Sequence, residues 1–151
     1  MQLIKDASAE KLRGAYYTPP AIASFILHWG INGGQDADIL EPSCGDGVFL
    51  ECMRDENMLF NTVTAIEYEA AEANKARTLG LHDSEVINQD FHRFCLDTDK
   101  RFDLVVGNPP FIRYQYYDTA QQKLADEIFK NANLKRTKLT NAWVTFVVGC
   151  T

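Results

Sequence analysis

Segments that favour β-strands alternate with segments that favour helices along this chain, and the alternation strongly limits how it can fold. The strand-like segments are apolar or rich in β-branched residues, and they cover residues 37–47, 61–67, 84–90 and 102–108. The helical segments cover residues 19–31, 47–57, 69–80, 118–130 and 140–150. Strands that alternate with helices through short connections form a parallel sheet with right-handed crossovers. The sequence therefore predicts a doubly wound α/β domain.

Length, hydropathy and cysteine usage predict one cytoplasmic domain. The 151 residues are enough for a single core, and no apolar run approaches the ~20 residues that span a bilayer. The charged N-terminal residues lack the apolar stretch of a secretion signal. The four cysteines have no paired spacing, so we expect reduced thiols and no metal site.

Charge is distributed unevenly along the chain. Residues 1–111 carry 9 Lys and Arg against 18 Asp and Glu, whereas residues 112–138 carry 6 against 3. A basic segment of this kind could follow a phosphate backbone, although a solvated helix face has the same composition. Charge alone does not decide between these interpretations.

Polar residues lie at the end of each of the four predicted strands. In doubly wound sheets, ligands bind beyond the carboxyl ends of the strands, where the strand order reverses. We therefore expect one site to be built from Glu41–Gly47, Glu67, Asp90 and Asn108–Phe111.

The stretch EPSCGDG, residues 41–47, predicts a tight turn from strand to helix. Gly45 and Gly47 let the backbone turn and approach a ligand closely. The third glycine of the dinucleotide fingerprint is absent, which disfavours a pyrophosphate ligand and a NAD-type dehydrogenase, whereas a nucleoside that bears a carboxylate would fit.

Glu67, twenty positions after Gly47, could accept hydrogen bonds from ribose hydroxyls. Asp90 could accept from an adenine amino group while the Phe91 ring packs on the base.

Upstream, the stretch GAYYTPP precedes the first predicted helix. Thr18 could cap that helix or hold a ligand carboxylate, and Tyr16 and Tyr17 could equally belong to the core.

The stretch NPPF, residues 108–111, follows the last predicted strand and ends it, because two prolines donate no ladder hydrogen bonds. Pro109 fixes the backbone of Asn108, so the Asn108 side-chain oxygen and the Pro109 carbonyl form two rigid acceptors. Two acceptors on one amino group localise its lone pair and activate it as a nucleophile without a general base. Pro110 completes the turn and Phe111 offers a face on which a base that has left its helix can stack.

Together these stretches resemble the N6-adenine DNA methyltransferases that use S-adenosylmethionine, in the γ order of motifs and with a likeness to restriction-linked members. GAYYTPP resembles that family's N-terminal cofactor motif, EPSCGDG its Gly-rich motif and NPPF its catalytic motif. The resemblance implies a Rossmann-like class I methyltransferase fold, S-adenosylmethionine as cofactor and a flipped adenine in DNA as target. It also implies that the cofactor lies against residues Tyr16, Tyr17, Thr18, Glu41, Pro42, Cys44, Gly45, Glu67, Asp90 and Phe91.

The resemblance implies that residues 1–151 are part of a methyltransferase domain. The cofactor motif would cover 11–31, the cofactor-binding half 37–100 and the catalytic motif 102–114. Family members continue through further strands and a target-recognition domain, so we expect an incomplete sheet here. We also expect self-association or a second polypeptide that supplies the missing strands.

Two alternatives remain open from the sequence. A methyltransferase that acts on protein glutamine amides or on guanine in RNA also uses an Asn-Pro-Pro-aromatic motif, because the target nitrogen poses the same geometric problem. A catalytically inactive cofactor-binding or assembly subunit would keep the same fold.

Overall fold

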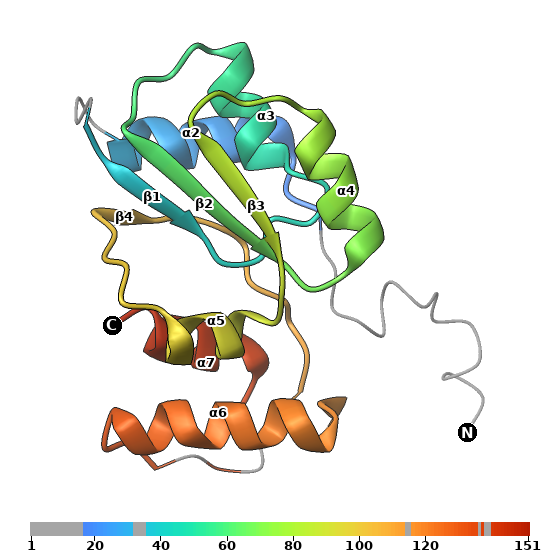
Figure 1. The fold of residues 1–151 in the computed structure, drawn as a ribbon, viewed down its shortest axis with the longest axis vertical. Coiled ribbons are helices and arrows are strands. Elements are labelled where there is room, and N and C mark those ends of the chain that lie inside the picture. Colours follow the sequence, from blue (N-terminus) through green and yellow to red (C-terminus); the bar gives the residue numbers. More distant parts are fainter. Residues whose placement is uncertain (1–16, 32–35, 114–115, 136, 138–139) are drawn as a thin grey trace.

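The computed structural model describes residues 17–31, 36–113, 116–135, 137 and 140–151. Its four strands are β1 (Asp38–Glu41), β2 (Thr62–Glu67), β3 (Ser84–Asn88) and β4 (Leu104–Val105). They form one sheet in the order β3-β2-β1-β4, in which every neighbouring pair is parallel (Figure 1). The predicted doubly wound α/β fold is therefore confirmed.

Helices cover both faces of this sheet. Among the described residues, one face carries α2 (Pro20–Ile31), α3 (Val48–Asp55) and α4 (Ala70–Thr78). The other face carries α5 (Phe91–Asp97), α6 (Thr119–Asn131) and α7 (Ala142–Gly149), with α6 packed on α5 and α7 (Figure 1). In the part of the chain that is described, no helix is long and apolar enough to cross a membrane.

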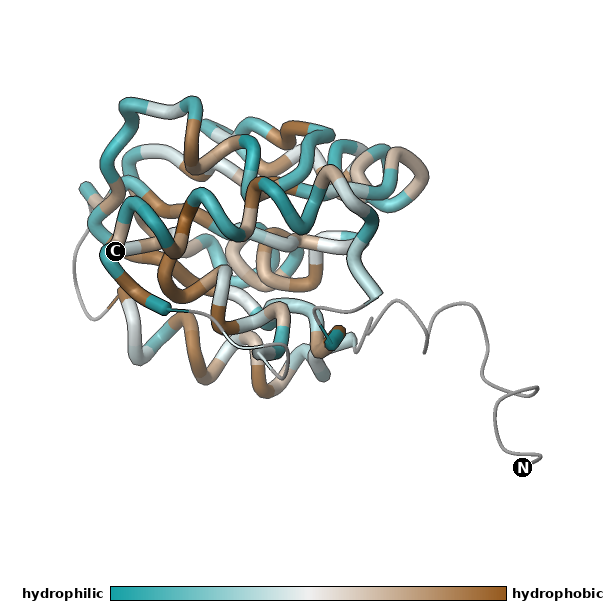
Figure 2. Tube along the Cα trace, turned by 90° about the horizontal axis from the view of Figure 1, so that it is seen from below, coloured by the Kyte–Doolittle hydropathy of each residue, from teal (hydrophilic) through white to brown (hydrophobic). Residues whose placement is uncertain are grey.

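The core lies on both sides of the sheet because successive strand residues face opposite sides. Ile39, Val63 and Ala65 belong to the cluster under α2 and α3, whereas Leu40 and Ile66 belong to the cluster on the α5 and α7 side. A strand buried on both faces has a continuous apolar sequence, which explains the composition of these segments. Figure 2 shows hydrophobic and hydrophilic residues interspersed along much of the chain.

Two details differ from the sequence-based expectations. The short helix α5 was not predicted, because its seven residues are too few for a clear helical repeat. Helix α2 was predicted from four large apolar residues at helical spacing, Ile22, Phe25, Ile26 and Trp29, but of these four Ile26 alone packs against the core. Its buried residues are small or aliphatic (Ala23 and Leu27), and the exposed fractions of Ile22, Phe25 and Trp29 are 51%, 70% and 79%.

The strand order places the site. The chain moves outward from β1 through β2 to β3, then returns to place β4 on the other side of β1. The order therefore reverses between β1 and β4, and a crevice is expected beyond their carboxyl ends. The Gly-rich turn follows β1 and the NPPF stretch follows β4.

Candidate functional site

A cavity of about 360 Å³ lies beyond the carboxyl ends of the strands, a volume within the usual range for small-ligand sites. Its lining includes most of the predicted site residues: Tyr17, Thr18, Glu41, Pro42, Cys44, Gly45, Glu67, Asp90, Phe91, Asn108 and Pro110. Pro109 and Phe111 are not among the described residues that line it, and Tyr16 lies outside the described part of the chain. Segments that are far apart in the sequence thus meet around one cavity.

The Gly-rich turn brings backbone close to this cavity. Gly45 has a φ of 57°, and a Cβ added to it would meet no described atom within 4 Å. The space beside its backbone is therefore open to a ligand. Gly47 has a different role from the predicted approach to a ligand. Its φ is 98°, and an added Cβ would lie 2.6 Å from Leu79, so this glycine permits close packing of the turn on α4.

Glu67 connects the end of β2 to this turn. Its Oε2 accepts from the Gly45 N–H at 2.8 Å, and its Oε1 accepts from the Glu69 N–H at 2.7 Å. Burial raises the pKa of Glu67, although both backbone donors lower it. Each oxygen keeps capacity for a further hydrogen bond at the cavity, so the ribose role stays a prediction with suitable geometry.

Glu41 is the buried acid of the site. Its exposed fraction is 1%, and its Oε2 has no hydrogen-bond partner among the residues described. Burial, and then the neighbouring carboxyl groups of Glu67 and Asp46, raise the pKa of Glu41 well above its usual value. A ligand that carries positive charge would relieve both effects, because it would pair with the ionised carboxylate.

Cys44 lines the cavity as a thiol, with no thiolate character. It is buried, and its N–H donates to the Ile66 carbonyl at 2.9 Å. Burial, followed by the charges of Glu41 and Glu67, raises the pKa of Cys44 above its usual value. A thiol in this state is a poor nucleophile, so its role is limited to contact.

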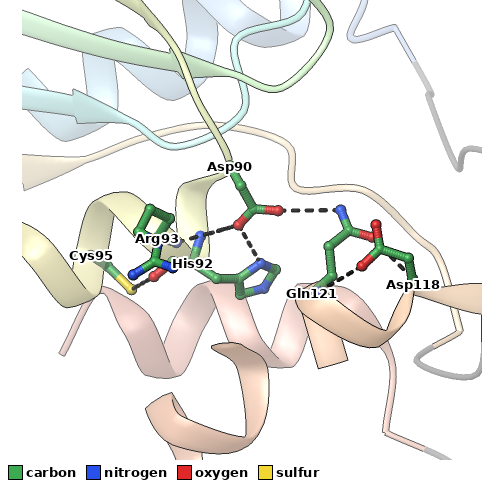
Figure 3. A network of polar contacts seen from close by, with 6 residues as sticks. All are labelled: Asp90, His92, Arg93, Cys95, Asp118 and Gln121. Atoms are coloured by element: carbon green, nitrogen blue, oxygen red, sulfur yellow. Dashed lines mark hydrogen bonds and ion pairs between the residues drawn. The ribbon is translucent and has the colours of Figure 1, made fainter. Parts of the chain in front are cut away.

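Asp90 lies just beyond β3 and begins α5 (Figure 3). Its Oδ1 accepts from the His92 N–H at 2.8 Å and from the His92 ring at 3.0 Å, and its Oδ2 accepts from Gln121 at 3.2 Å. Burial acts to raise the pKa of Asp90. The hydrogen bonds and charge of His92 and the hydrogen bond from Gln121 lower it by more, so the pKa of Asp90 lies below its usual value. Asp90 is therefore an ionised acceptor at the cavity.

Phe91 contributes to the core as well as to the cavity. Its exposed fraction is 3%, and its ring stacks on Phe146 with centroids 4.6 Å apart. The predicted contact with a base stays untested.

The stretch that follows β4 and contains Asn108 lies beside the turn that follows β1. The Ser43 hydroxyl donates to the Asn108 main-chain carbonyl at 3.5 Å, and an added Cβ on Gly107 would lie 3.3 Å from Pro42. Phe111 follows with an exposed fraction of 52%. Asn108 thus shares the cavity with Glu67 and Asp90, whereas the aromatic ring next to it faces outward enough to meet a partner.

Sequence reasoning missed several residues that line the cavity, among them His92, Tyr117, Gln121 and Phe146. The sequence indicated only that Gln121 falls three positions after Asp118, which is the spacing of a capping box. Nothing in that spacing tells which distant residue the side chain meets.

In a comparison with known protein families, the model of the family described as N-6 DNA Methylase matches residues 2–151. The type II methyltransferase M.CvrRI of Paramecium bursaria Chlorella virus XZ-6E is 32% identical over 121 residues, which cover 74% of this chain and 30% of the viral protein. The type II methyltransferase M.HincII of Haemophilus influenzae is 27% identical over 122 residues, which cover 78% of this chain and 21% of that protein. The chain thus spans less than a third of the length of these relatives.

Among solved structures, the methyltransferase subunit of a type I restriction-modification system from Streptococcus thermophilus superposes with a TM-score of 0.65. Its sequence is 20% identical, and the match covers 91% of this chain and 32% of that one. A Listeria monocytogenes protein described as a class I S-adenosylmethionine-dependent methyltransferase superposes with a TM-score of 0.62 at 14% identity, over 87% of this chain and 40% of that one. These likenesses establish the class I methyltransferase fold.

Proposed function

The chain belongs to the N-6 DNA methylase family, and we propose that it forms the cofactor-binding and catalytic part of an adenine-specific DNA methyltransferase. The enzyme would transfer a methyl group from S-adenosylmethionine to the N6 amino group of adenine, as in restriction-modification systems. The observation that carries the proposal is the shared cavity, which joins Asn108 after β4 to Glu67 at the end of β2 and to Asp90 after β3.

The cavity residues suit S-adenosylmethionine. The unpartnered, buried carboxyl oxygen of Glu41 suits a cationic ligand, and the open backbone at Gly45 allows close approach. Glu67 would hold the ribose and Asp90 the adenine, while Thr18 and Tyr17 would meet the methionine end. When bound there, the cofactor supplies an electrophilic methyl group on a sulfonium.

The catalytic work of the chain would be to hold and activate the target nitrogen. Asn108 and the Pro109 carbonyl would accept both hydrogens of the adenine amino group, which localises the nitrogen lone pair toward the methyl donor. The nitrogen becomes acidic only after the methyl has been transferred, so no side chain has to remove a proton first. Phe111, half-exposed beside the turn, would stack on the flipped base.

DNA contact through the basic segment receives mixed support. Arg113, Lys123 and Lys130 are exposed. However, Asp126 and Glu127 lie in the same helix α6, so this helix alone is not a positive surface. DNA binding in the proposal therefore rests on the family and on NPPF more than on charge.

Partners of the chain are also a proposal. Strand β4 has two residues and pairs with β1 alone among the described strands, and Val105 is 39% exposed. Such an edge suits another strand. We propose that self-association or a second polypeptide covers it, and sedimentation velocity tests this: a stable, well-folded monomer with no tendency to associate would contradict the proposal.

The function is tested by producing the full open reading frame that contains this chain in a bacterial host that lacks adenine methylation. Mass spectrometry of the host DNA should then detect N6-methyladenine, and much less of it should form when the host produces the Asn108→Ala variant. Methylation of protein glutamine or of RNA guanine in place of DNA adenine would support the corresponding alternative. Cofactor binding without any methyl transfer would support an inactive subunit.

A further inference from the structure

Gln121 reaches Asp90 from a helix that follows the NPPF stretch in the sequence. Its Nε2 donates to the Asp90 Oδ2 at 3.2 Å, across 31 positions of sequence (Figure 3). Both residues line the cavity. The side chain that holds the proposed adenine acceptor therefore comes from α6 and not from the neighbourhood of β3.

The Gln121 side-chain amide is oriented by one hydrogen bond at each end, from the Asp118 backbone N–H to its oxygen and from its nitrogen to Asp90. Asp118 and Gln121 form a capping box at the start of α6: the Asp118 Oδ1 accepts from the Gln121 N–H at 2.8 Å, and the Gln121 Oε1 accepts from the Asp118 N–H at 3.3 Å. Because the amide oxygen faces this backbone donor, the amide nitrogen faces the Asp90 carboxylate (Figure 3). Each end of the amide thus meets its complement, which excludes the flipped orientation.

The hydrogen bonds of Asp90 leave limited room for a ligand. A carboxylate has about four acceptor positions, two on each oxygen. The Oδ1 accepts from the backbone and the ring of His92, with a longer bond of 3.4 Å from the Arg93 N–H. The Oδ2 accepts from Gln121 alone among the described donors. One strong acceptor position therefore remains, on the oxygen that Gln121 holds.

We propose that Gln121 is a positioning residue that holds the Asp90 Oδ2 so that its remaining lone pair accepts from the amino group of the cofactor's adenine. This inference rests on the proposed function, because it requires an adenosyl ligand at Asp90. It makes recognition of the cofactor's adenosine moiety depend on α6. The segment after the catalytic stretch therefore contributes to the cofactor pocket.

The test compares binding of S-adenosylhomocysteine with binding of S-inosylhomocysteine, which has a carbonyl oxygen in place of the amino group. Titration calorimetry with the 151-residue chain should show a clear preference for the adenosyl compound. Gln121→Glu keeps the capping box, since Glu also serves at this position, but it places a carboxylate against Asp90. We expect the affinity for S-adenosylhomocysteine to fall roughly tenfold, as for one lost charge-assisted hydrogen bond, with a smaller loss for the inosyl compound.

A pH series separates positioning from a loss of structure. In Gln121→Glu, the two carboxyl groups can share a proton at lower pH, and a protonated Glu donates to Asp90 as Gln does. The affinity ratio between variant and parent should therefore recover toward one as the pH falls. Gln121→Met, which has no donor, should show the same loss of preference without recovery, and it remains informative if the Glu variant does not fold at neutral pH.

Asp118→Ala is the matched control. It removes the cap of α6 but leaves Gln121, so the melting temperature should fall while the preference for the adenosyl compound stays. An undiminished preference in both Gln121 variants would overturn the inference and leave the proposed function intact. Failure of the parent chain to bind either compound would overturn the inference together with its premise of an adenosyl pocket.

Discussion

The carboxyl ends of β2 and β3 differ from the carboxyl end of β4 in how far the chain itself fixes the predicted site residues. Glu67 and Asp90 each accept hydrogen bonds on both carboxylate oxygens from donors within the described chain. Strand β4 has two residues and one described neighbour, and Phe111 beyond it is half-exposed. The proposed cofactor side is therefore preorganised, whereas the proposed target side faces outward, where DNA and any further polypeptide would approach.

The largest effect should come from Asn108 on the target side. In the complete enzyme, Asn108→Ala should lower kcat by roughly 10²–10³-fold, because it removes one of the two acceptors that activate the amino group. The dissociation constant for S-adenosylhomocysteine should stay within about twofold, since the cofactor side keeps its contacts. Single-turnover methyl transfer and calorimetry measure the two quantities. Full activity in this variant would mean that the catalytic assignment is wrong.

The opposite pattern should follow from Glu67 on the cofactor side. Glu67→Ala removes the acceptor of the Gly45 and Glu69 N–H groups together with the proposed ribose contact. We expect the affinity for S-adenosylhomocysteine to fall roughly 10–100-fold, as for one or two hydrogen bonds to a charged group.

Glu85→Ala is the control for this variant, because Glu85 is an exposed acid on β3 that pairs with Lys100. It should bind the cofactor like the parent. If Glu67→Ala also binds S-adenosylhomocysteine as tightly as the parent does, then the carboxyl end of β2 is not part of a cofactor-binding side of the site.

The smallest effect should be a change in how stability depends on pH. Glu41 has a folded-state pKa raised well above its usual value of 4.5, so the folded chain binds this proton more tightly than the unfolded chain. Ionisation of Glu41 therefore opposes folding. The stability that the protonated Glu41 contributes is fully present below pH 4.5 and is lost as the pH rises toward the raised pKa. Glu67 acts in the same direction.

Glu41→Gln should remove part of that loss. The ligand-free variant should melt at the parent's temperature near pH 4.5 and above it near pH 8, because the amide does not have to ionise in the buried site. Thermal melts across this range measure the difference, and cofactor affinity should fall in the same variant. A variant that melts below the parent at pH 8 would show that the buried carboxylate is stabilised by contacts other than those described.

The sequence predicted the layout of the site because its residues follow strands. Glu67 ends β2, and Asn108 comes three positions after β4, so a parallel sheet brings them to one edge whatever else the chain does. It did not predict α5, because a seven-residue helix forms only with its Asp90 cap and with burial of Phe91 and Phe94. The same helix placed Phe91 against Phe146, a contact that the Asp-Phe pair alone did not indicate.

The sequence by itself determined the strand-and-helix alternation, the turns and the order of the chemical groups, since these depend on local composition and on glycine and proline geometry. Only the tertiary structure decided which side chains meet at the cavity. Gln121 bonds to Asp90, and Gly47 packs on Leu79, because separate helices fold onto the same sheet. Contacts of this kind depend on the packing of distant segments, and spacing along the chain does not record them.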